Sequence, residues 1–62
     1  AINTYLAVKA RYYKAAGDIP LALRYINEVL ETERLPEDIQ FKADILKEQG
    51  RLEEVMALYD EL

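Results

Sequence analysis

The chain contains no histidine, no cysteine and no serine, and these absences remove most of the side chains on which enzyme chemistry depends. Without cysteine there is neither a disulfide framework nor a thiolate metal site. Without histidine or serine, general-base and nucleophile-base pairs have little to use, because the only hydroxyls belong to threonines and tyrosines. We therefore expect no catalytic residue, no metal site, no cofactor and no enzyme activity.

Carboxylates are the exception, since aspartate and glutamate are abundant. Glu53 with Glu54, or Asp60 with Glu61, could be imagined as an acid pair or as calcium ligands. Neighbouring positions on a helix point about 100° apart, so such pairs do not converge on one ligand. We interpret them as solvated charges on helices.

Positive charge is scarce, and so are long apolar runs. Eight basic side chains stand against twelve acidic ones, which gives a formal net charge of −4. A chain with this balance has no overall attraction for phosphate backbones or anionic lipid surfaces. No apolar run reaches the roughly 18 residues of a membrane span. These features predict a soluble protein, with the cytoplasm as the expected compartment, and they disfavour nucleic acid and membranes as partners.

Glycine is also rare, and the positions of the two glycines are informative. Gly17 and Gly50 stand 33 positions apart, and the same offset aligns Ala10 with Ala43. Nearly every apolar residue of the second half then falls opposite an apolar residue of the first. The chain is therefore predicted to contain two copies of one unit. The expected repeats are residues 3–35 and 36–62, within a single domain of residues 1–62.

The first repeat has the spacing of two amphipathic helices. Asn3 or Thr4 is expected to cap the first helix, which ends near Ala16, and Gly17 supplies the left-handed conformation that follows. Asp18 is the expected N-cap of the second helix, which extends to about Thr32.

The second repeat has the same organisation. Pro36 is expected to begin a third helix, in which Asp38 and Lys42 form an i,i+4 pair, and Gly50 ends it. A fourth helix begins near Arg51. Its apolar residues are expected to point inward: Leu52, Val55, Met56, Tyr59 and Leu62. Short connections between four helices favour antiparallel neighbours, so the predicted fold is all-α, with two tandem helix-turn-helix hairpins.

This unit resembles the tetratricopeptide repeat, a helix-turn-helix of about 34 residues. With both glycines on the turn glycine of that family, Ala10 and Ala43 fall on its small position, and the stretch GRLEEVMALY from Gly50 to Tyr59 is similar to the family pattern. Lys9 and its counterpart Lys42 depart from that pattern, because they replace an apolar residue. The resemblance implies a short right-handed α-solenoid that binds proteins or peptides as a non-enzymatic adaptor or assembly module.

Two alternatives remain open. The pentatricopeptide repeat, of about 35 residues, reads single-stranded RNA one base per repeat. The spacing from Phe41 to Gly50 is too short for its first helix, and the net charge is negative. The second alternative is a structural or self-associating part of a longer helical-repeat protein.

The resemblance also implies where a partner binds, because the first helices of tetratricopeptide hairpins line a concave surface that holds extended peptides. The first repeat places five residues there: Thr4, Ala7, Val8, Arg11 and Lys14. The second repeat adds Glu37, Gln40, Phe41, Asp44 and Lys47. The core of this expected peptide groove is Ala7, Arg11, Lys14, Gln40, Phe41, Asp44 and Lys47. Its cations favour a peptide with an acidic residue near one end.

A second surface is expected on the last hairpin. Repeat stacks normally need about three units and a polar outer face on the terminal one, which this sequence lacks. Four residues are therefore expected to stay partly exposed as an association face: Ile45, Met56, Leu58 and Leu62. Such a patch is normally covered by another chain, which predicts self-association, a partner helix or a longer stack.

Overall fold

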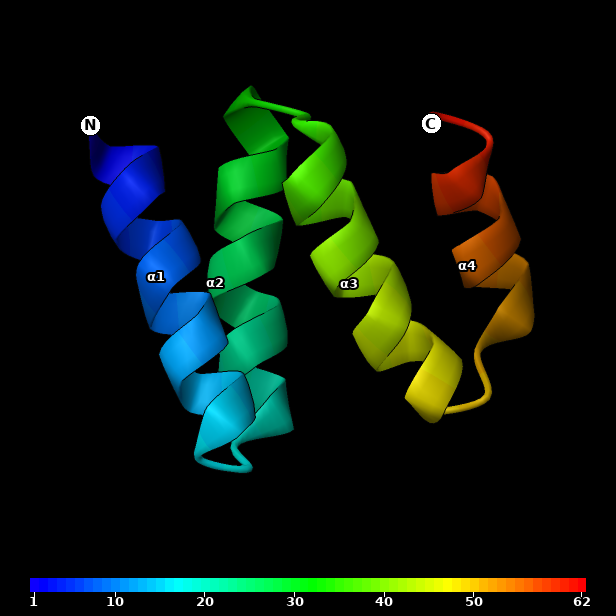
Figure 1. Cartoon of the computed structure of the whole chain (residues 1–62), viewed down its shortest axis with the longest axis horizontal. Helices are drawn as coiled ribbons and strands as arrows, with labels where there is room; N and C mark the ends of the chain where they lie inside the picture. The colour runs from blue at the N-terminus through cyan, green and yellow to red at the C-terminus, as the bar shows by residue number, and fades with distance from the viewer.

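The computed structural model describes residues 1 to 62 and contains four helices and no strand. The helices are α1 (Ile2–Ala15), α2 (Ile19–Thr32), α3 (Pro36–Glu48) and α4 (Leu52–Tyr59). They follow one another across the molecule with alternating direction, so α1 and α4 lie at opposite edges (Figure 1). Helix α1 packs on α2, α2 on α3 and α3 on α4. The predicted all-α arrangement of tandem antiparallel hairpins is confirmed. No helix has the length and apolar character needed to cross a bilayer.

Both glycines end their helices through the same backbone arrangement. Gly17 has a φ of 86° and Gly50 a φ of 75°, in the left-handed region that favours glycine. The amide of each glycine donates to the carbonyl three residues earlier at 3.0 Å. The amide of the next residue donates to the carbonyl five residues earlier at 2.9 Å. These two bonds form a Schellman motif in each hairpin, so the repeat in the sequence is also a repeat of backbone geometry.

The start of α2 follows the prediction, whereas the start of α1 does not. The Asp18 carboxylate accepts a hydrogen bond from the Leu21 amide at 3.2 Å and caps α2. Helix α1 begins before Asn3 and Thr4, and neither side chain caps it. The Nδ2 atom of Asn3 instead donates to the Thr32 hydroxyl at 2.9 Å. The predicted cap was wrong because the amide group of Asn3 binds the end of the neighbouring helix.

The interior is one apolar cluster shared by all four helices. Its buried members are Ala10, Ile26, Val29, Leu30, Ile39, Ala43, Leu46, Val55 and Leu58. The alanines at 10 and 43 contribute little volume but are fully buried, which is consistent with close approach of helices at these two positions. The cluster joins the two hairpins into a single packed body.

The predicted burial on the second hairpin needs two corrections. Ile45 and Leu58 are buried and do not belong to an exposed association face. Ile45 is covered because α3 has α2 on one side and α4 on the other, and Leu58 points into the core cluster. Conversely, Leu52 and Met56 of α4 and Leu62 after it are exposed and do not point inward, since α4 has only α3 beside it. Of the four predicted association residues, Met56 and Leu62 are exposed.

Two arginine–glutamate ion pairs stabilise the last helix and the residues that follow it. Arg34, in the connection after α2, donates from Nη2 to Oε2 of Glu61 at 2.7 Å, and its Nε donates to the other carboxylate oxygen. At the start of α4, Arg51 forms the same kind of bidentate ion pair with Glu54. The hydrogen bonds from Arg34 lower the pKa of the Glu61 carboxyl, and those from Arg51 lower the pKa of Glu54.

Acidification is therefore expected to weaken the folded state as Glu54 and Glu61 are protonated. Each folded-state pKa lies below the ordinary value of 4.5, so the stabilisation is complete above that value and is lost as the pH falls through the lower one. Thermal unfolding at pH 7, 4 and 3 should show a falling midpoint. The fall should be smaller in the double variant Glu54→Gln with Glu61→Gln.

A matched control is the double variant Glu48→Gln with Glu53→Gln, because neither of these carboxylates takes part in an ion pair. It should keep the wild-type dependence on pH. The two arginine pairs are solvent-exposed, so the difference should shrink in high salt. Identical pH profiles for the wild type and the first double variant would contradict a stabilising role for these pairs.

Candidate functional site

An open cavity of about 260 Å³ lies between α1 and the start of α3. Helix α1 contributes five of its lining residues: Asn3, Thr4, Ala7, Val8 and Arg11. The α2–α3 connection contributes Glu33 and Leu35, and α3 contributes Glu37 and Asp38. The α1 residues recur every three or four positions, which places them on one face of the helix. The cavity therefore contains Ala7 and Arg11 of the predicted groove.

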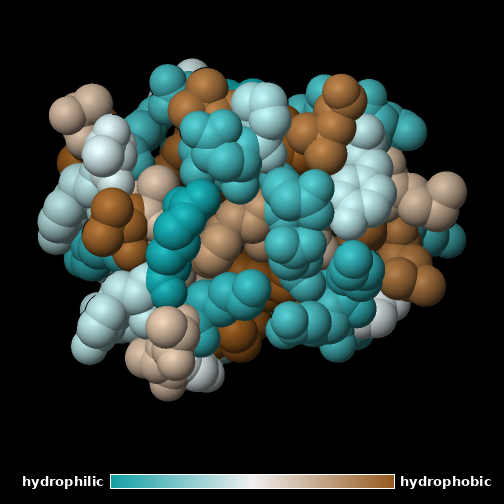
Figure 2. Space-filling model, in the orientation of Figure 1, coloured by the Kyte–Doolittle hydropathy of each residue, from teal (hydrophilic) through white to brown (hydrophobic).

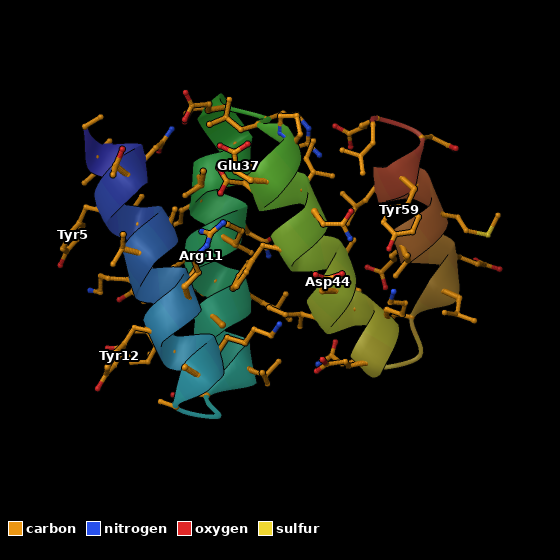
Figure 3. All side chains as sticks on the ribbon, viewed as in Figure 1. Tyr5, Arg11, Tyr12, Glu37, Asp44 and Tyr59 are labelled. Atoms are coloured by element: carbon orange, nitrogen blue, oxygen red, sulfur yellow. The ribbon has the colours of Figure 1, made fainter.

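Arg11 connects the two walls of this cavity. Its Nη2 lies 3.4 Å from Oδ1 of Asp38, and its Nη1 donates to the Ala7 carbonyl at 3.1 Å. Its guanidinium carbon lies 4.8 Å from the centroid of the Phe41 ring, within the range of a cation–π contact. Figure 3 shows the Arg11 side chain between α1 and α3. One side chain thus joins the two hairpins through a charge pair and an aromatic contact.

Asp38 is the only buried charged side chain, and sequence reasoning gave it a different partner. It pairs with Arg11 of the first hairpin, while the predicted pair with Lys42 is not formed. A buried carboxylate needs a close cation, and Arg11 supplies it from the neighbouring hairpin. Lys42 lies instead near Arg34 and Arg51. Its partial burial is the main reason why its pKa is lowered, and the positive charges of these two arginines lower it further.

The charge around the cavity is the reverse of the one expected. The charge of Arg11 is largely balanced by Asp38, and Glu33 and Glu37 add two further carboxylates to the lining. The lining of the cavity therefore has more carboxylates than cations. The free cations lie at the other end of the groove: Lys14 and Lys47 are both in the last turns of their helices.

Phe41 has less free surface than expected of a peptide contact. It is partly buried and packs against the core cluster, and the Lys14 ammonium lies 5.5 Å from its ring centroid. Arg11 and Lys14 therefore both lie over this one ring. Phe41 holds the two cations along the groove.

Gln40 and Asp44 form a separate polar group at α3 and α4. The Nε2 of Gln40 donates to Oδ1 of Asp44 at 2.9 Å and to the Tyr59 hydroxyl at 3.3 Å. Figure 3 shows Tyr59 on α4 with its ring toward α3. Of the predicted groove residues, Ala7 and Arg11 line the cavity and Gln40 and Asp44 belong to this second group, whereas Lys14, Phe41 and Lys47 belong to neither. Sequence reasoning missed Tyr59, which it assigned to the interior.

A cluster of aromatic residues surrounds Lys9. The Lys9 ammonium lies 4.5 Å from the ring centroid of Tyr25 and 5.2 Å from that of Tyr5, and contact with these side chains raises its pKa. Tyr13 and Tyr25 stack on each other with their centroids 5.7 Å apart. Because these two rings already pack together and are partly buried, they offer little free face to a nucleic acid base.

No cluster of three or more aspartate and glutamate side chains has the geometry to hold a metal ion. Comparisons of this chain with protein-family models, with curated proteins and with solved structures gave no match. The cavity, the Arg11–Asp38 pair and the distribution of charge are therefore the observations from which a function can be argued.

Proposed function

We propose that this chain is a non-enzymatic binding module of tetratricopeptide type, which holds a short extended peptide along the groove between α1 and α3. The observation that carries the proposal is the open cavity between the first helices of the two hairpins, lined by charged, polar and apolar side chains. An arrangement of this kind can bind a chain by charge and shape.

The charge distribution defines the peptide more closely. Helices α1 and α3 run in the same direction, so Lys14 and Lys47 lie at one end of the groove and Glu33 and Glu37 lie at the other (Figure 1). A helix rises about 1.5 Å per residue, so Glu37 and Lys47 are about 15 Å apart along α3. An extended peptide of about five residues spans this length. The favoured ligand therefore carries a basic residue at one end and an acidic residue at the other.

A pair of synthetic peptides tests this assignment by NMR titration of the labelled protein. The first is a six-residue peptide with lysine at one end and glutamate at the other, and the second has glutamine at both positions. We expect weak binding, with Kd roughly 0.1 to 1 mM, because exposed ion pairs contribute only about 0 to 1 kcal/mol each. The first peptide should bind several-fold more tightly, at low salt only, with shifts confined to α1 and α3.

Glu37→Gln should remove most of this preference, because Glu37 is exposed, lines the cavity and forms no internal ion pair. Glu31→Gln is the matched control, since Glu31 is exposed on α2 and does not line the cavity. Equal affinities for the two peptides, or equal effects of the two substitutions, would contradict the proposal. Strongly salt-dependent binding of single-stranded RNA would favour the pentatricopeptide alternative instead.

A further inference from the structure

The outer helices α1 and α4 are the repeat counterparts of α3 and α2, the two helices that form the interface between the hairpins. Helices α2 and α3 pack against each other between the hairpins. Because the second hairpin repeats the first at an offset of 33 residues, α3 is the counterpart of α1 and α4 is the counterpart of α2. The outer face of α1 therefore matches the face of α3 that the first hairpin covers. The outer face of α4 matches the face of α2 that covers α3.

The exposures on α1 follow this correspondence. Asp38 and Ile45 of α3 are 4% and 1% exposed, whereas their counterparts Tyr5 and Tyr12 on α1 are 57% and 65% exposed. Both helices have their own hairpin partner, so the difference arises from the first hairpin, which lies beside α3 only. Figure 3 shows Tyr5 and Tyr12 projecting away from the molecule at the outer edge of α1.

The exposures on α4 show the other side of the same interface. Ile26 of α2 is fully buried, whereas its counterpart Tyr59 is 38% exposed. Leu23 is partly buried, whereas its counterpart Met56 is 67% exposed. Figure 2 shows hydrophobic side chains at the edge of the molecule over α4. We call the exposed faces with Tyr5 and Tyr12 and with Met56 and Tyr59 the α1 edge and the α4 edge.

The charges of the two edges are complementary. Of the three cations in residues 1–17, Arg11 pairs with Asp38 and Lys14 lies over Phe41, so Lys9, beside Tyr5, is the cation next to the α1 edge. Residues 51–62 contain four carboxylates and one arginine, and Glu53 and Asp60 among them form no ion pair. Opposite charges favour contact between an α1 edge and an α4 edge, and like charges oppose contact between two α1 edges or two α4 edges. A second copy of this chain therefore presents, at its own α1 edge, a surface that fits the α4 edge in position and in charge.

We propose that copies of this chain stack head to tail, with α4 of one copy packed on α1 of the next as α2 packs on α3 within the molecule. In this register Asp44 of one copy meets Tyr5 of the next, at the place where Arg11 meets Asp38 internally. A hydrogen bond from the tyrosine hydroxyl to the carboxylate then replaces the internal ion pair. The contact joins two different surfaces, so it is heterologous. A stack of any length therefore keeps a free α1 edge at one end and a free α4 edge at the other, and further copies can add to it. The proposal concerns the edges and does not rest on peptide binding in the groove.

Sedimentation of the 62-residue chain over a range from about 20 μM to 1 mM tests the stacking. A contact between single helices is small, so the association should be weak and visible only toward the upper end of this range. The weight-average mass should rise steadily above 7.2 kDa with concentration, and more steeply at low salt. A constant monomer mass up to 1 mM overturns the proposal, and so does a mass that levels off at a dimer.

Two exposed substitutions distinguish head-to-tail stacking from symmetric pairing. Tyr12→Glu blocks the α1 edge and Met56→Glu blocks the α4 edge, because each places a carboxylate without a partner in the contact. Each variant alone should associate at least tenfold more weakly than the wild type. An equimolar mixture should form a two-chain complex and nothing larger, through the one edge that each variant keeps. A mixture that behaves as the sum of its components overturns the proposal.

Ala57→Glu is the matched control for the added charge. Ala57 is exposed on α4, and its counterpart on α2 is Arg24, whose side chain is 71% exposed and lies outside the internal interface. This variant should associate as the wild type does. Loss of association in Ala57→Glu equal to that in Met56→Glu would assign the effect to net charge and overturn the assigned register. Circular dichroism of each variant at low concentration confirms that the fold is retained.

Discussion

Replacing Ile26 by alanine is expected to remove a large part of the stability of the protein. Ile26 lies on α2, is fully buried and belongs to the core cluster that joins the two hairpins. Truncating a buried isoleucine to alanine costs about 2 to 5 kcal/mol, through lost burial and the cavity that remains. A chain of this length has a total stability of only about 3 to 9 kcal/mol. One such cavity therefore removes at least about a fifth of the stability, and all of it where the total is small.

Urea and thermal unfolding followed by circular dichroism measure this loss. The midpoint of thermal unfolding should fall by roughly 15 to 25 °C for a loss of about 3 kcal/mol in a domain of this size. Asn27→Ala is the control on the same helix, because Asn27 is exposed, and it should stay within about 0.5 kcal/mol of the wild type. The unfolding measurements should be made at low protein concentration, so that the proposed stacking between copies adds nothing to the stability. A loss below 1 kcal/mol for Ile26→Ala would contradict its central place in the core.

The sequence predicts the helices and turns well because their signals are local. A glycine with positive φ is required wherever a helix ends in a Schellman motif, so Gly17 and Gly50 mark both turns. Asp18 lies immediately before a helix and needs no distant partner to cap it. The N-terminal cap of α1 was mispredicted because Asn3 has a better partner, Thr32, that is 29 positions away in the sequence.

Burial at the edges could not be predicted from the pattern alone. An amphipathic pattern shows which face of a helix is apolar, but the number of neighbours decides how much of that face is covered. Ile45 is buried because α3 has helices on two sides, and Met56 is exposed because α4 has a helix on one side. Both residues were assigned to the predicted association face, and the number of neighbouring helices explains why one is buried and the other exposed.

The candidate site shows the same limit. Ala7 and Arg11 were placed in the groove by the resemblance to the tetratricopeptide repeat, and the cavity contains both. The Arg11–Asp38 pair joins side chains 27 positions apart, and no local spacing rule identifies it. That pair balances the charge of Arg11, so the cavity lining keeps the unpaired carboxylates of Glu33 and Glu37, while Lys14 and Lys47 remain at the other end of the groove. The residues of the cavity could thus be named from the sequence in part, whereas the charge pair that crosses it could not.

Enlarging Ala43 to leucine is the substitution with the second largest expected effect. Ala43 is fully buried in α3, and extra methylene groups in a well-packed interior cost about 1 to 3 kcal/mol, because neighbouring side chains and helices must shift. Denaturant unfolding should show this loss. Ala57→Leu adds the same side chain to an exposed position on α4 and should change the stability by less than about 0.5 kcal/mol.

The counterpart substitution Ala10→Leu is expected to cost less than Ala43→Leu, although both alanines are fully buried. Helix α3 is held between α2 and α4, so it cannot move away from a larger side chain without disturbing a second interface. Helix α1 has a free outer edge and can shift outward. Equal costs at the two positions would show that α1 is held as firmly as α3, and that its free edge gives it no freedom to move. If copies stack as proposed, the difference between the two costs should narrow as the protein concentration rises, because the next copy then covers α1.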